Sequence, residues 1–208
     1  MQQLEQEFKW DASARGAFSA FLRALKQGGE LSRVRRLAIR DYYLDNARQD
    51  FTRDKVALRI RRTGKRFEAT LKTRNAVKNG FASRRELTLP LSNVRSMRGA
   101  LARLEQRGDW EGYALEGLQV RFCIANQRAA YQWKAGGCVC EAALDNYVTL
   151  AKGYQWRRKE IELELKKGSV KTYQKLAQKL SVLSALSAAK ISKVAGAEQW
   201  LKTKVSKS

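Results

Sequence analysis

Histidine is absent from all 208 positions of the sequence, and a common nucleotide-binding loop is missing as well. Without histidine, Ser-His-Asp and Cys-His catalysis, histidine-ligated zinc and imidazole acid–base chemistry are excluded. No GxxxxGK[ST] motif occurs, which excludes a Walker-type nucleotide site. An enzyme built from this chain must therefore use carboxylates, lysine, arginine, tyrosine or a metal ion held by oxygen atoms.

Cysteine and long apolar runs are also scarce. The three cysteines are Cys123, Cys138 and Cys140, an odd count that does not suit a secreted disulfide framework. The start of the chain, residues 1–9, is polar and acidic, unlike a signal peptide. No stretch of about 18 apolar residues exists, so no membrane span is expected. These absences predict a cytoplasmic protein whose cysteines are small buried apolar residues.

Positive charge is abundant. Lysine and arginine number 42 against 20 aspartate and glutamate residues, which gives a net charge of +22. This excess predicts a polyanionic partner, such as a phosphate-rich small molecule, polyphosphate or RNA. At 44% hydrophobic residues the chain can still bury a core, and its length suits one domain with a tail.

Hydrophobic periodicity divides the chain into strands and a few helices. Alternation with period two predicts strands over 4–9, 34–45, 55–62, 66–73, 82–89, 118–124, 128–134, 138–145 and 158–166. Helical spacing predicts helices over 13–27, over 94–104 with an N-cap at Ser92 or Asn93, and after Gly168-Ser169. Short links such as residues 63–65 favour hairpins, so the fold class is α+β with a mainly antiparallel sheet.

Charged side chains share one face of several predicted strands. Because alternate residues of a strand point the same way, Glu5 and Glu7, Arg59 and Arg61, and the acidic residues of 160–164 form like-charged sets. On a single strand this pattern is typical of a solvent-facing sheet surface. If the sheet instead closes into a barrel, the charged face becomes a lumen.

Such a lumen has a definite chemistry. Clustered carboxylates suit hard cations such as Mg²⁺ or Mn²⁺, whereas arginine and lysine suit phosphate oxygens. Together they form the combination needed for metal-assisted phosphoryl transfer. The alternatives are an open sheet with one charged, wet face, and a basic binder of polyphosphate or nucleic acid that has no catalytic activity.

An ordered series of motifs resembles the CYTH superfamily, the triphosphate tunnel metalloenzymes. The series begins with ExExK at residues 5–9 and continues through Tyr42-Tyr43-Leu44-Asp45, Leu58-Arg59-Ile60-Arg61, Thr70-Leu71-Lys72, Arg84-Arg85-Glu86, Arg128, the ExxxD of 141–145 and the alternating glutamates of 160–165. The match covers roughly residues 3–183. Its spacing is closest to the bacterial inorganic triphosphatase branch.

The resemblance implies an eight-stranded antiparallel β-barrel tunnel with flanking helices that binds a linear triphosphate. The residues it assigns to phosphate binding are Lys9, Arg59, Arg61, Lys72, Arg84 and Arg128. The candidate ligands for two Mg²⁺ or Mn²⁺ ions are Glu5, Glu7, Glu141, Asp145, Glu160, Glu162 and Glu164. Lys9, Glu5 and Glu7 are the candidate catalytic residues, and Glu68, Arg74 and Glu86 are either direct contacts or partners in lumen ion pairs.

The implied activity is metal-dependent hydrolysis of inorganic triphosphate by a domain spanning 1–183, followed by a basic tail over 184–208. Class IV adenylate cyclase and the thiamine, nucleoside and RNA 5′-triphosphatases share the tunnel and remain alternatives, because no base-recognition pocket is evident. The tail region from 166 onward carries ten lysines against one glutamate.

Overall fold

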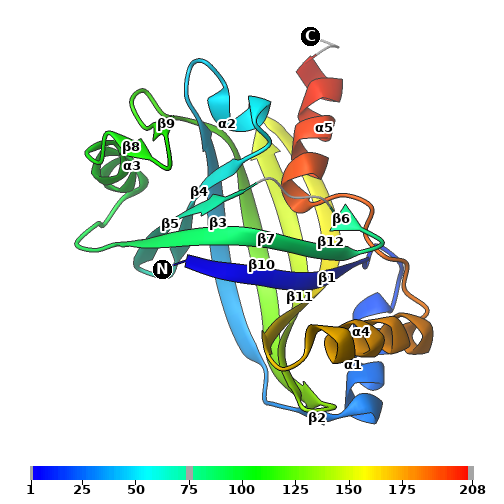
Figure 1. Ribbon diagram of the computed structural model, residues 1–208. Helices are drawn as coiled ribbons and strands as arrows, with labels where there is room; N and C mark the ends of the chain where they lie inside the picture. Colours follow the sequence, from blue (N-terminus) through cyan, green and yellow to red (C-terminus); the bar gives the residue numbers. More distant parts are fainter. Residues whose placement is uncertain (1, 74–76, 206–208) are drawn as a thin grey trace.

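The computed structural model describes residues 2–73 and 77–205 and contains a closed antiparallel barrel (Figure 1). Its eight strands follow one another around the barrel in the order β1-β12-β11-β10-β3-β4-β5-β7, and β7 pairs with β1 to close the circle. The strands are β1 (Gln2–Asp11), β3 (Arg35–Asp45), β4 (Ala57–Thr63), β5 (Arg66–Lys72), β7 (Phe81–Leu91), β10 (Gln119–Ala135), β11 (Cys138–Ala151) and β12 (Tyr154–Lys167). The predicted eight-stranded tunnel with flanking helices is confirmed.

Short strands and helices complete the described part of the chain. The short strands are β2 (Glu30–Leu31), β6 (Val77–Lys78), β8 (Asp109–Trp110) and β9 (Tyr113–Ala114). The helices are α1 (Ala17–Gly28), α2 (Asp50–Arg53), α3 (Met97–Glu105), α4 (Val170–Ser184) and α5 (Lys193–Val205). Figure 1 shows α1 and α4 side by side at one end of the barrel, α3 with β8 and β9 at one side, and α5 at the other end. No described helix is both long and apolar enough to cross a membrane.

Two apolar clusters attach the helices to the outside of the barrel. Phe21 and Leu25 of α1 and Tyr173 of α4 pack with Trp10 and Ile161 of the barrel wall. Around α3, a second cluster covers the outer side chains of β4, β5 and β7. These outer residues alternate with the charged ones along each strand, so burying them directs the charged set into the lumen.

Three boundaries differ from the sequence prediction. Residues 118–124 and 128–134, predicted as two strands, belong to one continuous strand, β10, because polar Asn126 points into the lumen and not into a loop. β11 continues past its predicted end at 145 to Ala151, and β12 begins at Tyr154, before its predicted start at 158. The two strands are joined by a turn at Lys152 and Gly153, both at positive φ. The N-cap of α3 is Ser96, whose hydroxyl accepts a hydrogen bond from the Gly99 amide, and not Ser92 or Asn93.

Within the predicted tail, α5 packs against one end of the barrel. Ala197 and Leu201 join a third apolar cluster with Tyr43, Phe122 and Tyr147. On the same helix, Trp200 stacks on Trp156 of β12, with ring centroids 5.9 Å apart. The predicted domain boundary at residue 183 stays a prediction. In the structure the segment beyond it lines one end of the lumen, with residues from Ser192 to Lys202 facing the cavity.

Candidate active site in the tunnel

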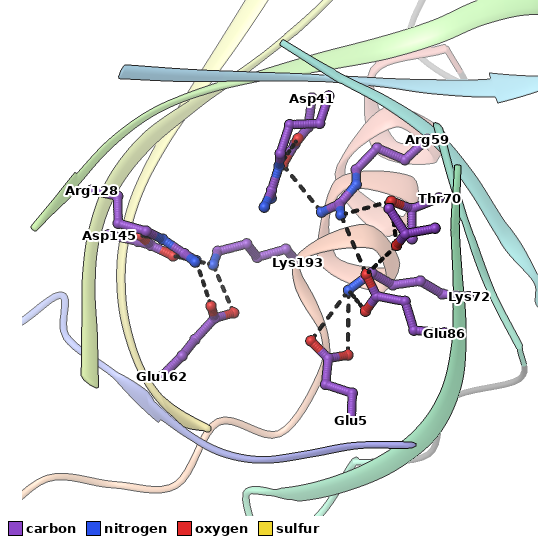
Figure 2. Close-up of polar contacts among 12 residues, drawn as sticks. Glu5, Asp41, Arg59, Thr70, Lys72, Glu86, Arg128, Asp145, Glu162 and Lys193 are labelled. Atoms are coloured by element: carbon purple, nitrogen blue, oxygen red, sulfur yellow. Dashed lines mark hydrogen bonds and ion pairs between the residues drawn. The ribbon is translucent and has the colours of Figure 1, made fainter. Parts of the chain in front are cut away.

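The lumen of the barrel is a cavity of about 600 Å³ in which charged side chains form the majority of the lining. Figure 2 shows two groups of them facing each other across the lumen, one around Arg128, Glu162 and Lys193 and the other around Arg59, Lys72 and Glu5. A cavity of this volume lies within the range of small-ligand sites. Its lining differs from the apolar lining usual for such sites and favours a highly charged ligand.

Lys9 stands at the centre of the first group. Its ammonium group lies 3.0 Å from Glu7 Oε2 and 3.7 Å from Glu160 Oε1, and it donates a short hydrogen bond to Glu162. Burial by itself lowers the pKa of Lys9, but the carboxylates of Glu162, Glu7 and Glu160 outweigh it and raise that pKa. Lys9 is therefore a permanent cation among three carboxylates.

Arg128 and Lys193 hold the remaining acids of this group. Arg128 makes a bidentate pair with Asp145 at 2.7 and 2.6 Å and also donates to Glu162 Oε2 at 2.6 Å. The Lys193 ammonium pairs with Asp145, lies 2.8 Å from Glu162 Oε1 and lies 3.1 Å from Glu160 Oε1. Two cations on different elements thus share one set of carboxylates.

The second group contains Arg59 and Lys72 with two glutamates. Lys72 Nζ lies 2.7 Å from Glu86 Oε2 and 3.3 Å from Glu5. Arg84 donates to both Glu5 and Glu7, the latter at 2.8 Å. Arg59 lies 3.7 Å from Glu86 and 3.6 Å from Asp41, and it donates a hydrogen bond to the Thr70 hydroxyl at 3.3 Å. It is therefore the cation with the longest ion pairs in this group.

Arg61 and Asp41 form a bidentate pair at 2.7 and 2.8 Å on the adjoining wall. Burial raises the pKa of Asp41, but Arg61 and Arg59 outweigh that effect and hold the pKa well below its usual range. Glu5 behaves in the same way, because Lys72 and Arg84 overcome its burial. These acids remain ionised across the physiological pH range and keep their cations in place.

The pKa of Glu160 shifts in the opposite direction from those of Glu5 and Asp41. Burial raises its pKa to about 7, because the opposing effects of Lys193 and Lys9 are too small to cancel it and Glu162 adds repulsion. The side chain is buried, and its Oε1 accepts no hydrogen bond. Its contacts through Oε1 are ion pairs with Lys193 at 3.1 Å and Lys9 at 3.7 Å.

The raised pKa of Glu160 predicts a pH-dependent stability. Between its ordinary value of 4.5 and its folded value of about 7, the folded state binds more protons, so stability falls as pH rises through this window. A shift of this size corresponds to about 3 kcal/mol at about 1.4 kcal/mol per unit. Urea unfolding measured from pH 4.5 to 7.5 is expected to show this fall in the wild type and a flatter profile in Glu160→Gln. Parallel profiles for the two proteins would contradict the assignment.

The structure brings most of the predicted site residues to the lumen. Those that lie in the two groups or on the adjoining wall are Glu5, Glu7, Lys9, Arg59, Arg61, Lys72, Arg84, Arg128, Asp145, Glu160 and Glu162. Glu141 and Glu164 also line the cavity but pair with Arg35 and Lys166. Glu86 is a partner in lumen ion pairs, Glu68 lines the cavity, and Arg74 lies outside the described residues.

Sequence reasoning missed Asp41 and Lys193, which form ion pairs inside the lumen. The other missed charged residues that line the cavity are Lys55, Lys166, Glu198 and Lys202. Asp41, Tyr43 and Asp45 lie two residues apart on β3 and so on the same face of the strand. The alternation of that strand could therefore have predicted that Asp41 points into the lumen. Lys193 lies at the start of α5 and is one of ten tail lysines. No local pattern distinguishes it, since only the docking of α5 brings it into the tunnel.

The acids of the lumen suit a divalent metal ion by their chemistry. Carboxylate oxygens are the preferred ligands of Mg²⁺ and Mn²⁺, and the buried Oε1 of Glu160 accepts no hydrogen bond, although Lys193 and Lys9 pair with it. Among residues 2–73 and 77–205, no three acidic or cysteine side chains are already grouped to hold an ion. Lysine and arginine side chains lie between the acids, so metal binding requires some of these ion pairs to open.

A closed antiparallel barrel whose lumen holds buried cations paired with buried carboxylates defines a charged-tunnel protein. Within that class, the chain belongs to the CYTH domain family, which matches residues 3–197. CYTH tunnel enzymes generally depend on divalent metal ions. A sequence comparison with curated proteins finds no match.

Solved structures confirm the fold at low sequence identity. The Hippeastrum protein HpAC1, described as having a dominant triphosphatase activity, is 21% identical with a TM-score of 0.67, covering 94% of this chain and 95% of its own. The PH1819 protein of Pyrococcus horikoshii is 18% identical with a TM-score of 0.61, covering 96% and 99%. The triphosphatase of the Mimivirus capping enzyme is 12% identical with a TM-score of 0.55, covering 87% and 90%.

Proposed function

We propose that this protein hydrolyses inorganic triphosphate to pyrophosphate and phosphate inside the tunnel, in a reaction that depends on a divalent metal ion. The observation that carries the proposal is the lumen itself, in which buried cations and buried carboxylates alternate around a cavity lined at one end by α5. A simple polyanion binder has no use for the carboxylates, because they repel phosphate.

The cations of the lumen are suited to bind the phosphates of the substrate. Arg59, Arg61, Lys72, Arg84 and Arg128 project from different strands toward one cavity, so they can contact a linear chain of phosphates from several sides. Arginine suits this role because its planar fork binds two phosphate oxygens at once. Arg59 has the longest ion pairs in its group, so it can turn to a phosphate at the smallest cost in broken ion pairs.

The carboxylates supply the metal site. Glu5, Glu7, Asp145, Glu160 and Glu162 are the candidates nearest the cations, and Glu141 and Glu164 lie farther along the lumen wall. When phosphates draw the lysine and arginine groups away, these oxygens become free for an ion, so substrate and metal favour each other's binding. A bound divalent ion supplies charge neutralisation and lowers the pKa of a coordinated water.

Lys9 and Glu160 are suited to handle water and protons near the terminal phosphate. Lys9 keeps its charge, and its ammonium group can hold an attacking water in line with the phosphorus–oxygen bond to be broken. The pKa of Glu160, about 7, suits a group that accepts a proton at neutral pH. As the water oxygen bonds to phosphorus, the bridging bond breaks and pyrophosphate leaves.

The groups that converge on the cavity favour a small, highly charged substrate. Ala197 and Leu201 of α5 join Tyr43 and Tyr147 in one apolar cluster, and cations and carboxylates from the barrel strands reach the cavity. We therefore place inorganic triphosphate before nucleotides, thiamine triphosphate and RNA ends as the substrate.

Phosphate release tests the proposal. Tripolyphosphate, ATP and pyrophosphate are each incubated with Mg²⁺, with Mn²⁺ and with EDTA, and released phosphate is measured. Release is expected to be fastest from tripolyphosphate and to fall to background with EDTA, because the acids cannot polarise water without an ion. Cyclic AMP with pyrophosphate from ATP would instead identify a cyclase, and no release from any compound would contradict the proposal.

A further inference from the structure

Five basic side chains gather on the outside of the barrel, opposite the lumen side of the same strands. We call this surface the outer basic wall, and it comprises Arg36 and Arg40 of β3, Arg62 of β4, and Arg157 and Lys159 of β12. All five are exposed. Within residues 2–73 and 77–205, none of them forms an ion pair with a carboxylate, although ion pairs are numerous inside the lumen.

Strand register places these cations at two edges of one surface. Arg62 of β4 is directly opposite Arg40 of β3. The same cross-strand row continues from Arg40 through Ala125 of β10 and Val148 of β11 to Arg157 of β12. Three strand spacings separate Arg40 from Arg157, which is about 14 Å along the sheet. The wall is therefore broad enough to contact several phosphates of a polymer, in contrast to the enclosed lumen.

The wall carries no compensating acid. All carboxylates on β3, β11 and β12 alternate with the wall residues along their strands, so they face the lumen or its rim. These seven residues are Asp41, Asp45, Glu141, Asp145, Glu160, Glu162 and Glu164. Like charges directly opposite on neighbouring strands destabilise a sheet. The repulsion between Arg40 and Arg62 therefore lowers the stability of the sheet, and an anionic partner would remove this repulsion.

Small and amide side chains occupy the centre of the wall. Ala38, Gln127 and Asn146 lie in one cross-strand row and are exposed, so no described helix covers them. Helices α1 and α4 pack at the far end of these strands, and α3 packs on β4, β5 and β7. An uncovered surface with amide groups between two cationic edges suits a polymer that carries both phosphates and hydrogen-bonding groups.

From these features we infer that the outer basic wall binds single-stranded RNA, independently of the chemistry in the tunnel. Phosphates would contact the arginine and lysine edges, and Gln127 and Asn146 would reach ribose hydroxyls and bases. A membrane surface is a poorer match, because the centre lacks the large apolar side chains that insert between lipids. A free polyphosphate chain offers acceptors but no donors, so it would leave the amide carbonyl oxygens unpaired.

The experiment measures binding of a fluorescent 5′-hydroxyl oligouridylate of about twenty nucleotides by anisotropy, in EDTA. The probe carries no triphosphate, so the tunnel has no substrate to bind. The wall variant is Arg40→Ala/Arg157→Ala, and the matched control is Lys171→Ala/Lys175→Ala on the exposed face of α4. Both variants remove two charges. Tripolyphosphate hydrolysis by each variant is expected to equal that of the wild type and serves as the folding control.

The wall variant is expected to bind the RNA on the order of tenfold more weakly at 0.1 M salt, with the salt slope reduced by about 1.4 for two lost phosphate contacts. The control variant is expected to retain the wild-type slope. An equal loss in both variants would overturn the inference, since total charge alone would then explain binding. The absence of RNA binding at low salt would also overturn it. Loss of binding to phosphatidylserine vesicles with unchanged RNA binding would assign the wall to a membrane instead.

Discussion

Glu162→Gln is expected to lower kcat for tripolyphosphate by at least about 100-fold while leaving its binding unchanged or tighter. Glu162 accepts hydrogen bonds from Lys9, Arg128 and Lys193, more cations than contact any other acid of this group. Glutamine keeps the volume but removes the charge. The lumen then has one acid fewer to hold a metal ion and one repulsion fewer against phosphate.

This split between turnover and affinity separates catalysis from polyanion binding. Initial rates give kcat, and isothermal titration with tripolyphosphate in EDTA gives the dissociation constant without turnover. Glu30→Gln is the matched control, because Glu30 is 84% exposed and lies 4.0 Å from Lys134, outside the tunnel. A Glu162→Gln protein that turns over at the wild-type rate would remove Glu162 from the catalytic site.

Lys9→Met is expected to lose both stability and activity. The ammonium group of Lys9 is 3% exposed and lies among Glu7, Glu160 and Glu162. Removing one partner of a buried charge cluster costs about 3–5 kcal/mol, because the remaining charges stay buried and uncompensated. Turnover is expected to fall at least about 100-fold, since the group proposed to hold the attacking water is lost.

Thermal unfolding with and without Mg²⁺ tests this variant. At about 2–4 °C per kcal/mol, the expected loss lowers the Tm by about 6–20 °C. Mg²⁺ is expected to raise the Tm of Lys9→Met more than that of the wild type, because an ion can take the place of the ammonium group among the same acids. If the variant does not fold at neutral pH, measurement at pH 5.5 reduces the repulsion, since the pKa of Glu160 is about 7. An unchanged Tm together with unchanged turnover would refute this role for Lys9.

Period-two alternation predicted the barrel walls well, because a strand with one charged and one apolar face leaves little freedom in register. Glu5, Arg59 and Glu162 were placed on a common face by this argument and by the family motifs. The alternation fails where both faces of a strand are partly polar. Around Asn126 the sequence resembles a break between strands, yet the lumen accepts the amide and β10 continues.

The pairing inside the lumen could not be predicted from sequence. Alternation places Arg128 and Lys72 in the interior but does not say which acid each cation meets, because that depends on the closure of the sheet. Lys193 is a further case. Its ion pairs with Asp145 and Glu162 depend on how α5 docks, and docking is decided by contacts such as Leu201 with Tyr147.

The closure of β1 between β7 and β12 determines when the tunnel can exist during synthesis. Lys9 meets Glu162 across 153 positions of sequence, so at about 5–20 residues per second the first strand waits roughly 8–30 s for its last partner. Until then one edge of β1 has no strand to bond with, and an unpaired strand edge invites association with other chains. The first strand of the tunnel therefore has an exposed edge during synthesis, where the charges of Glu5, Glu7 and Lys9 discourage such contacts.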